Sequence, residues 1–478
     1  MDIINIKSDK STVLWGYAAA LLSVASGLIV LPLILRCLSS EEVAVYYLLI
    51  TISSFAALFD LGFSPQISKN LTYIFSGADN IKKEGYSSST GSINYKLLKS
   101  LIEESKNIYK KISLAVFIVL AIFGTIYIIR VTKDTLPLDY ILPIWLLFVI
   151  ITTAQMYFFY YNAFMEGKGL IKRAKQINVI SRIFNIVIVS AFLLLGFKLW
   201  AVLIGYVFLL VVFVIFSKKA FYTKDITEEI KGIEVNKADL KDVFDKIWFN
   251  AKKVAIIYFA GFLINKSNLF IAGLYLDLNT VASLGLMMQF TSLIASLSEN
   301  FYLVMQPEII SLRVKNEQEK LIKKFSCGIV AYILLFMLGS IVLLTIVPFL
   351  LKLIGSNTEL PALSIVAVYC LICLLERQHA TFAAFISTGN RIFWLESTII
   401  VGVLIVVGSF LVLKYTSMGL IGLILVQGVI QLCYSNWKWP YEALKELKMN
   451  YFVFLYTGSR ELTSMIRSIL HITHSETK

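Results

Sequence analysis

The sequence predicts an all-α membrane protein with about twelve transmembrane helices in two six-helix bundles. Of the 478 residues, 58% are hydrophobic and only 16% are charged, whereas a soluble protein carries roughly 25% charged residues. Apolar runs of about 18 or more residues, long enough to cross a bilayer as a helix, recur along the whole chain. Very short polar connections alternate with long basic ones, as expected when a chain crosses a membrane repeatedly.

The apolar runs place the spans, in order, at residues 12–35, 43–64, 112–130, 138–164, 177–196, 200–217, 254–276, 281–306, 325–350, 361–387, 393–413 and 418–436. The first run is too long for a signal peptide and has no small-residue cleavage site after it, so we expect no cleaved leader. The spans predict an N-terminal bundle (residues 1–217), a cytoplasmic linker (218–253), a C-terminal bundle (254–436) and a cytoplasmic or interfacial tail (437–478).

Basic residues are distributed very unevenly across the predicted topology. Of the 44 lysines and arginines, those expected on the outer side are Arg36, Arg130, Lys133, Lys198, Lys352 and Lys414. By the positive-inside rule, this asymmetry predicts that both termini are cytoplasmic. The net charge of +13 is therefore mainly a topology signal with some attraction to anionic lipid head groups, and we expect no nucleic-acid partner.

The two predicted halves repeat each other weakly. Val43 opens one span that runs to Asp60, and Val281 opens another that runs to Glu299. Each half has an even number of spans, so both run in the same sense, which implies a pseudo-twofold axis along the membrane normal. In architectures of this kind the substrate site lies between the halves.

Lys266 lies at the centre of the predicted span 254–276. A lysine at mid-membrane costs roughly 2.5–3.5 kcal/mol, so it is rarely found there without a use. Snorkelling is difficult because either end of the helix is about 17 Å away. We predict that Lys266 contacts an anion, with Asn265 and Asn268 as weaker candidates for hydrogen bonds. Structural pairing of Lys266 with an intramembrane acid is the alternative.

Two arginines also lie within spans. Arg182 shares one helix face with Asn178 and Asn185 at i, i+4 and i+7 spacing, and the alternative to a cavity role is snorkelling to the cytoplasmic surface. Arg377 belongs to a run of four polar residues, 376–379, which occupies all sides of a helix. This run indicates either internal pairing of Arg377 with the preceding glutamate or a broken helix. We predict Arg182, Asn185 and Arg377 as further substrate contacts.

Three intramembrane acids are candidates for gating or ion coupling: Asp60, Glu299 and Glu376. Asp60 and Glu299 occupy near-equivalent places in the two halves, which favours pairing that changes during gating. A proton or sodium site is one alternative, and structural pairing or placement near a helix end is the other.

Catalysis has little support in the sequence. The predicted outer loops are too short for a domain, and no phosphate-binding P-loop is present, so we expect no enzymatic activity. Cys370 and Cys373 lie within a span without a second pair, and the chain has only three histidines. We therefore expect neither a metal nor a cofactor.

Three stretches near the N-terminus resemble a known family. They are Leu31-Pro32-Leu33-Ile34-Leu35-Arg36, Ser39-Ser40-Glu41-Glu42 and Leu58-Phe59-Asp60-Leu61-Gly62-Phe63. Together with the helix count and the two halves, they resemble the Wzx-type flippases for lipid-linked oligosaccharides such as O-antigen units, from bacterial inner membranes. The resemblance implies a fold like that of multidrug-and-toxin exporters, with a central cavity between the bundles.

The resemblance also implies a substrate, an undecaprenyl-diphosphate-linked oligosaccharide moved from the inner to the outer leaflet by alternating access. Membrane lipids, other polysaccharide-assembly proteins, and a proton, a sodium ion or the membrane potential as driving force are the implied partners. A diphosphate carries about two negative charges, which lysine and arginine can bind. Two alternatives stay open: a cation-coupled multidrug exporter of the same fold, in which acids should dominate at mid-membrane, and a flippase for a peptidoglycan precursor.

Overall fold

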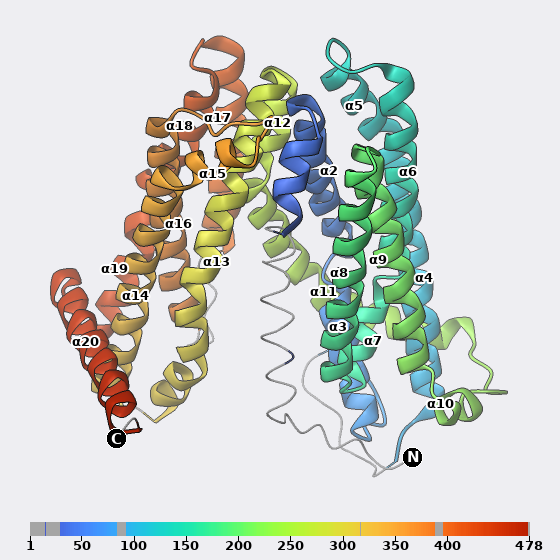
Figure 1. The fold of residues 1–478 in the computed structure, drawn as a ribbon. Helices are drawn as coiled ribbons and strands as arrows, with labels where there is room; N and C mark the ends of the chain where they lie inside the picture. Colours follow the sequence, from blue (N-terminus) through green and yellow to red (C-terminus); the bar gives the residue numbers. More distant parts are fainter. Residues whose placement is uncertain (1–14, 16–28, 84–91, 316, 388–394, 477–478) are drawn as a thin grey trace. The chain divides into compact units, whose positions relative to one another are not determined.

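A computed structural model describes residues 15, 29–83, 92–315, 317–387 and 395–476. These residues form helices and no strand, in two compact units, Met1–Phe262 and Leu263–Lys478 (Figure 1). Within the described ranges, 11 helices are long and apolar enough to cross a membrane, so the predicted multi-pass all-α class is confirmed. The predicted span 12–35 lies mostly outside the described residues, and residues 29–37 of it and just beyond are helical.

The N-terminal unit is built from helices. In order they are α2 (Ser40–Ala57), η1 (Leu58–Asp60), α3 (Phe63–Phe75), α4 (Tyr95–Val119), η2 (Leu120–Gly124), α5 (Thr125–Thr132), α6 (Leu138–Tyr157), α7 (Tyr160–Gly167), α8 (Ile171–Leu194), α9 (Leu199–Phe221), α10 (Lys224–Glu229) and most of α11 (Lys237–Asn265).

Helix α4 begins well before the predicted span at residue 112. Its first turns carry several lysines and glutamates, which lowers the mean hydropathy of this stretch. Leu98, Leu101 and Ile108 nevertheless fall on one face and are buried in the unit. The single π-helical turn η2 joins α4 to α5, so one helical segment runs from Tyr95 to Thr132. The same explanation applies to α11, whose first turns extend into the predicted linker.

Lys168, between α7 and α8, is a buried cation in the N-terminal unit. Only 4% of the residue is exposed, and its Nζ donates hydrogen bonds to the Phe221 carbonyl at 2.9 Å and to Thr223 Oγ1 at 3.4 Å. It therefore satisfies a carbonyl at the C-terminus of α9, where a positive charge is favourable. Burial lowers the pKa of Lys168 to about 8, although Asp225 acts in the opposite direction.

We expect Lys168 to make the stability of the protein depend on pH in the alkaline range. The folded protein releases this proton near pH 8, whereas the unfolded chain holds it up to about pH 10.5, so raising the pH between these values favours the folded state. The effect amounts to at most about 3 kcal/mol. Thermal unfolding in detergent should show the Tm of the wild type rising relative to Lys168→Met across this window. Lys219→Met, which alters an exposed lysine on α9, is the control and should run parallel to the wild type.

The C-terminal unit begins at the end of α11. It continues through α12 (Ser267–Tyr275), α13 (Leu278–Val314), α14 (Gln318–Thr345), α15 (Val347–Leu353), α16 (Leu363–Ser387), α17 (Leu395–Tyr415), α18 (Gly419–Cys433), α19 (Ser435–Leu447) and α20 (Tyr451–Glu476).

The predicted tail is part of the C-terminal unit. Its last helix, α20, packs along α14 (Figure 1). Phe454 on α20 is fully buried and lies 5.3 Å from the ring of Phe325, which stacks on Phe385 at 4.1 Å. An aromatic cluster of this kind contributes through packing area and ring geometry. The tail therefore completes the core of this unit.

Close contact between α20 and α14 depends on Gly458. A Cβ at this position would overlap the backbone carbonyl of Ser326 and lie 2.9 Å from Val330 Cγ2. We expect Gly458→Ala to push α20 away from α14 at a cost of about 1–3 kcal/mol. Limited trypsin digestion in detergent should then cleave at Arg460 more rapidly than in the wild type. The neighbouring exposed residue provides the control, since Ser459→Ala should leave the digestion rate unchanged.

Candidate functional site

The predicted span 254–276 is not one helix, because it breaks at Lys266. Helix α11 ends at Asn265, and α12 begins at Ser267. Lys266 has φ −126° and ψ −21°, outside the helical region, and makes no capping hydrogen bond with its side chain. Asparagine and serine favour helix ends, which explains why the break falls within this polar run. The break leaves backbone N–H groups of the first turn of α12 without partners inside that helix.

Lys266 is partly buried next to another cation. Within the described part of the chain it has no hydrogen-bond or ion-pair partner. The charged group that interacts with it electrostatically is Arg377. The expected alternative, pairing with Glu299 or Glu376, is therefore absent from this structure. Two neighbouring positive charges in a medium of low dielectric constant repel each other, and an anion bound near them would relieve that repulsion.

Arg377 and Glu376 are adjacent in sequence but bind different helices. The Arg377 Nε lies 3.7 Å from Glu299 Oε1 on α13, and these side chains are 36% and 26% exposed. Glu376 is buried and accepts a hydrogen bond of 2.8 Å from Gln427 Nε2 on α18. Helix α16 is continuous from Leu363 to Ser387, so the alternative of a broken helix at this run is wrong.

A chain of buried hydrogen bonds holds α12, the helix that follows the break, to its neighbouring helices. Gln427 accepts from Asn268 Nδ2 through its Oε1 at 2.6 Å, and Asn268 Oδ1 accepts from Ser409 at 3.4 Å. With Glu376, this chain joins α12, α16, α17 and α18, and each amide has a fixed orientation because its oxygen and nitrogen bond different partners. Asn268 is 5% exposed, so its predicted contact with substrate would require it to leave these partners. Asn265, the last residue of α11, is partly exposed.

One further amide on α18 is buried but is not part of this chain. Gln431 is one helical turn beyond Gln427 and is only 1% exposed. Neither its Nε2 nor its Oε1 has a hydrogen-bond partner among the described residues. A buried amide without partners is costly, and a water molecule or a bound group commonly supplies them.

The predicted contacts in the N-terminal unit lie along the packing of α8 on α9. Asn185 Nδ2 is buried, has no hydrogen-bond partner in the described chain, and would lie 2.8 Å from a Cβ at Gly205. Arg182 interacts electrostatically with Tyr206, which lies on α9. Helix α8 is continuous over these positions, and their role in binding stays a prediction.

Asp60 occupies a sharp bend between α2 and α3. Leu61 and Gly62 both have positive φ, and the Asp60 carboxylate accepts hydrogen bonds from the backbone N–H of Ser64 at 3.3 Å and from Tyr109 Oη at 2.5 Å. A carboxylate at the first turn of α3 stabilises that helix end. The surroundings of Glu299, inside the continuous helix α13, are different. The proposed equivalence of the two acids therefore does not extend to their local structure.

Glu42 is a buried acid whose partners the sequence analysis missed. It forms a capping box with Ser39, accepts a hydrogen bond from Tyr140 Oη at 2.6 Å, and lies 3.6 Å from Lys198 Nζ. The spacing Ser-x-x-Glu is the sequence signal of a capping box and could have identified the local part. The contacts with Tyr140 and Lys198 bridge distant segments, so no local pattern predicts them.

The described residues contain no group of three or more histidine, cysteine, aspartate or glutamate side chains that could hold a metal ion. The free cysteines Cys370 and Cys373 lie on α16, within the packed helices of the C-terminal unit.

Comparison with known proteins identifies the fold. No protein-family model matches the sequence, and no curated protein is significantly similar to it. Among solved structures, the inward-facing conformation of a multidrug resistance MATE family transporter of the MOP superfamily superposes with a TM-score of 0.60. The two chains are 16% identical, and the match covers 90% of this chain and 95% of that one.

Two other structures match with lower scores. The outward-facing conformation of a MATE family transporter has a TM-score of 0.45 and 16% identity, with 92% and 95% of the chains covered. A MOP superfamily transporter from Pyrococcus furiosus has a TM-score of 0.42 and 14% identity, with 92% and 95% covered. The match with a TM-score of 0.60 establishes the architecture. The chain is an all-α, multi-pass membrane protein with a fold like that of this MATE family transporter.

Proposed function

We propose that this protein is a flippase that moves an undecaprenyl-diphosphate-linked oligosaccharide from the inner to the outer leaflet of a bacterial inner membrane by alternating access. The observation that supports this most strongly is Lys266, a lysine at a helix break, without an acidic partner among the described residues and close to Arg377. Such a site attracts an anion, and it would be costly to maintain for a cationic or neutral substrate.

The chemistry of the site fits a diphosphate head group. Lysine supplies a compact positive charge, and arginine can bind phosphate oxygens in a bidentate way. The first N–H groups of α12 carry a partial positive charge, which favours binding of an anion at this helix N-terminus. Arg377 could exchange its contact with Glu299 for one with phosphate, because both of these side chains are partly exposed. Asn265, Arg182 and Asn185 stay candidate contacts for the sugars or phosphates.

The membrane potential is a sufficient source of energy for this movement. The positive-inside distribution predicts that both termini are cytoplasmic. The cytoplasmic side of the membrane is electrically negative, so the potential drives anions outwards. The gain is about 2.3 kcal/mol per charge per 100 mV. Glu376, buried and bonded to Gln427, is the candidate for an additional coupled proton, and Glu299 is the candidate for gating through its contact with Arg377.

A transport assay with the wild-type protein tests the proposal. Proteoliposomes containing the purified chain should move a fluorescent undecaprenyl-diphosphate-linked saccharide between leaflets faster than empty liposomes do. An inside-negative potential, with inside defined as the predicted cytoplasmic side, should increase the rate. The proposal would be contradicted if the protein is correctly folded, as judged by its thermal unfolding, but does not move this lipid.

A cation-coupled multidrug exporter is the second candidate. The fold similarity to a structure described as a multidrug resistance transporter favours it, as does the buried carboxyl group of Glu376. This function predicts that the same proteoliposomes export a cationic dye in response to a proton or sodium gradient. Dye export without movement of the lipid-linked saccharide would replace the first proposal by the second.

A further inference from the structure

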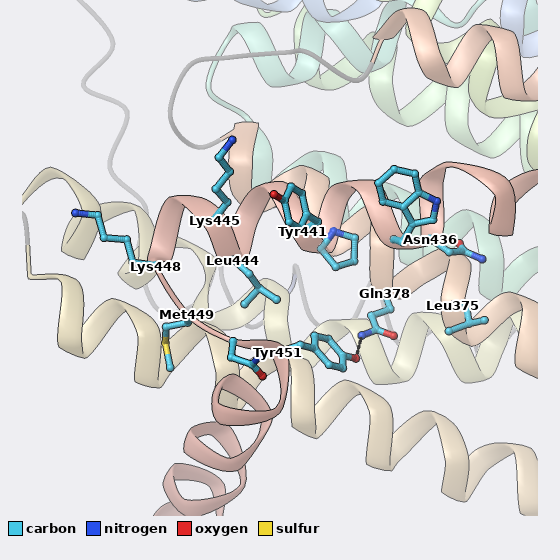
Figure 2. A pocket seen from close by; sticks show the side chains of 12 residues that line it. Leu375, Gln378, Asn436, Tyr441, Leu444, Lys445, Lys448, Met449 and Tyr451 are labelled. Atoms are coloured by element: carbon cyan, nitrogen blue, oxygen red, sulfur yellow. Dashed lines mark hydrogen bonds between the residues drawn. The ribbon is translucent and has the colours of Figure 1, made fainter.

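The C-terminal unit contains a cavity of about 820 Å³ where α19 and the start of α20 pack on α16 (Figure 2). Leu375, Leu444 and Met449 give it apolar walls, and the Gln378 amide donates a hydrogen bond to the Tyr451 hydroxyl beside them. Lys445 and Lys448 lie at the other end, at the turn between α19 and α20, and Figure 2 shows their side chains extending outwards from this turn. The cavity therefore combines apolar walls with a cationic end.

The positive charge of this end is only partly offset by its neighbours. No acidic side chain of the described residues lines the cavity. The two glutamates on α19 form ion pairs with other bases: Glu442 lies 2.8 Å from Lys438 Nζ, and Glu446 lies 2.5 Å from the Arg313 guanidinium. Glu442 also interacts electrostatically with Lys445, but among the described residues neither Lys445 nor Lys448 forms a direct ion pair.

The backbone at Lys448 gives a second, independent indication. Lys448 ends α19 in the left-handed region, with φ 54° and ψ 42°. Glycine is the usual residue at this position after a helix, because a β-carbon is disfavoured there. The chain carries a lysine where the backbone favours glycine, and such a locally unfavourable choice points to a use for the side chain.

Two aromatic side chains border the cavity. Trp437 and Tyr441 are 54% and 57% exposed, as is typical of aromatic residues near a membrane interface.

From the charge, the apolar walls and the exposed aromatic border, we infer that this cavity binds one anionic phospholipid from the surrounding leaflet. Its phosphate binds Lys445 and Lys448, and an acyl chain lies along Leu444 and Leu375. A lipid in this position contacts α16, α19 and α20 together and holds the two last helices against the unit. The inference concerns a bound structural lipid and does not depend on the identity of the transported substrate.

The test uses the full chain, purified in a neutral detergent. Added phosphatidylglycerol should raise the Tm of the wild type, and native mass spectrometry should show one bound molecule per chain. Phosphatidylcholine and inorganic phosphate at the same concentration should have much smaller effects. In the double variant Lys445→Gln/Lys448→Gln the affinity for phosphatidylglycerol should fall about 30-fold, since each basic side chain contributes roughly fivefold. Lys320→Gln/Lys323→Gln removes two lysines on α14 that pair with Glu317 and Glu319 and do not line the cavity; it is the charge-matched control and should bind like the wild type.

A third variant separates lipid binding from folding. Lys448→Gly removes one cationic contact but gives the backbone the residue that it favours, so the lipid-free Tm should rise while the response to phosphatidylglycerol falls. Three results would overturn the inference: equal stabilisation by phosphatidylcholine, an effect of inorganic phosphate as large as that of the lipid, or an unchanged response in the double variant. Any of these would show that Lys445 and Lys448 do not form an anionic-lipid site.

Discussion

Replacement of Lys266 by glutamine should reduce transport of the lipid-linked saccharide by about tenfold or more, because hydrogen bonds to charged groups contribute about 1.5–3 kcal/mol. Glutamine keeps a side chain of similar length with hydrogen-bonding atoms but removes the positive charge at the helix break. The loss should be measured as surface polysaccharide in a strain that lacks the chromosomal copy, at equal protein level, and as the rate in proteoliposomes.

Charge rather than shape should account for this effect. Lys266→Arg preserves the charge and should retain most of the activity, since arginine also binds phosphate. Lys352→Gln removes an exposed lysine at the end of α15 in the same unit and should have little effect. Undiminished surface polysaccharide in Lys266→Gln would contradict a role for Lys266 in binding the lipid-linked saccharide.

Two substitutions of Glu376 should separate its structural role from a coupling role. Glu376→Leu removes the acceptor for Gln427 Nε2 and leaves that buried donor unsatisfied, which should cost about 1–3 kcal/mol of stability. Glu376→Gln keeps an oxygen that can accept the same hydrogen bond, so its Tm should stay close to that of the wild type. If Glu376 carries a coupled proton, however, Glu376→Gln should lose the part of the transport rate that depends on a pH gradient.

The matched control for this pair is Ser409→Ala, at the far end of the same hydrogen-bonded chain. Its contact with Asn268 is long, at 3.4 Å, so the substitution should change the Tm less than Glu376→Leu does. Destabilisation of Glu376→Gln to the same extent as Glu376→Leu would show that the negative charge itself holds this region together. The proposed proton-coupling role would then have no separate support.

The sequence predicted those parts of the fold that depend on local composition. The spans on either side of Gly196 were placed correctly because an apolar run long enough to cross the hydrocarbon core is typical of a transmembrane helix. Helices α4 and α11 were predicted to begin too late, since their first turns are amphipathic rather than uniformly apolar. The buried face of Leu98 and Leu101 could have been recognised from helical periodicity, whereas hydropathy alone conceals it.

The site was predicted less completely, because its contacts join segments distant in sequence. Lys266 was singled out by the cost of a charge at mid-membrane, which is a local argument. The break itself depends on whether neighbouring helices satisfy the freed backbone groups, and the sequence does not show which neighbours those are. For the same reason the ion pair of Arg377 with Glu299 on α13 was not predicted, although Glu376, the partner expected from the sequence, also interacts electrostatically with Arg377.

The position of Phe454 within the aromatic cluster also has a consequence for the order in which the C-terminal unit can mature. The cluster draws on Phe325, Phe382 and Phe385, which are synthesised and enter the membrane well before Phe454. Until α20 has been made, these rings have no partner on that side, and the half-finished unit presents an apolar surface to chaperones and proteases. A nonsense mutation anywhere between residues 388 and 453 should therefore yield a chain that is inserted but rapidly degraded.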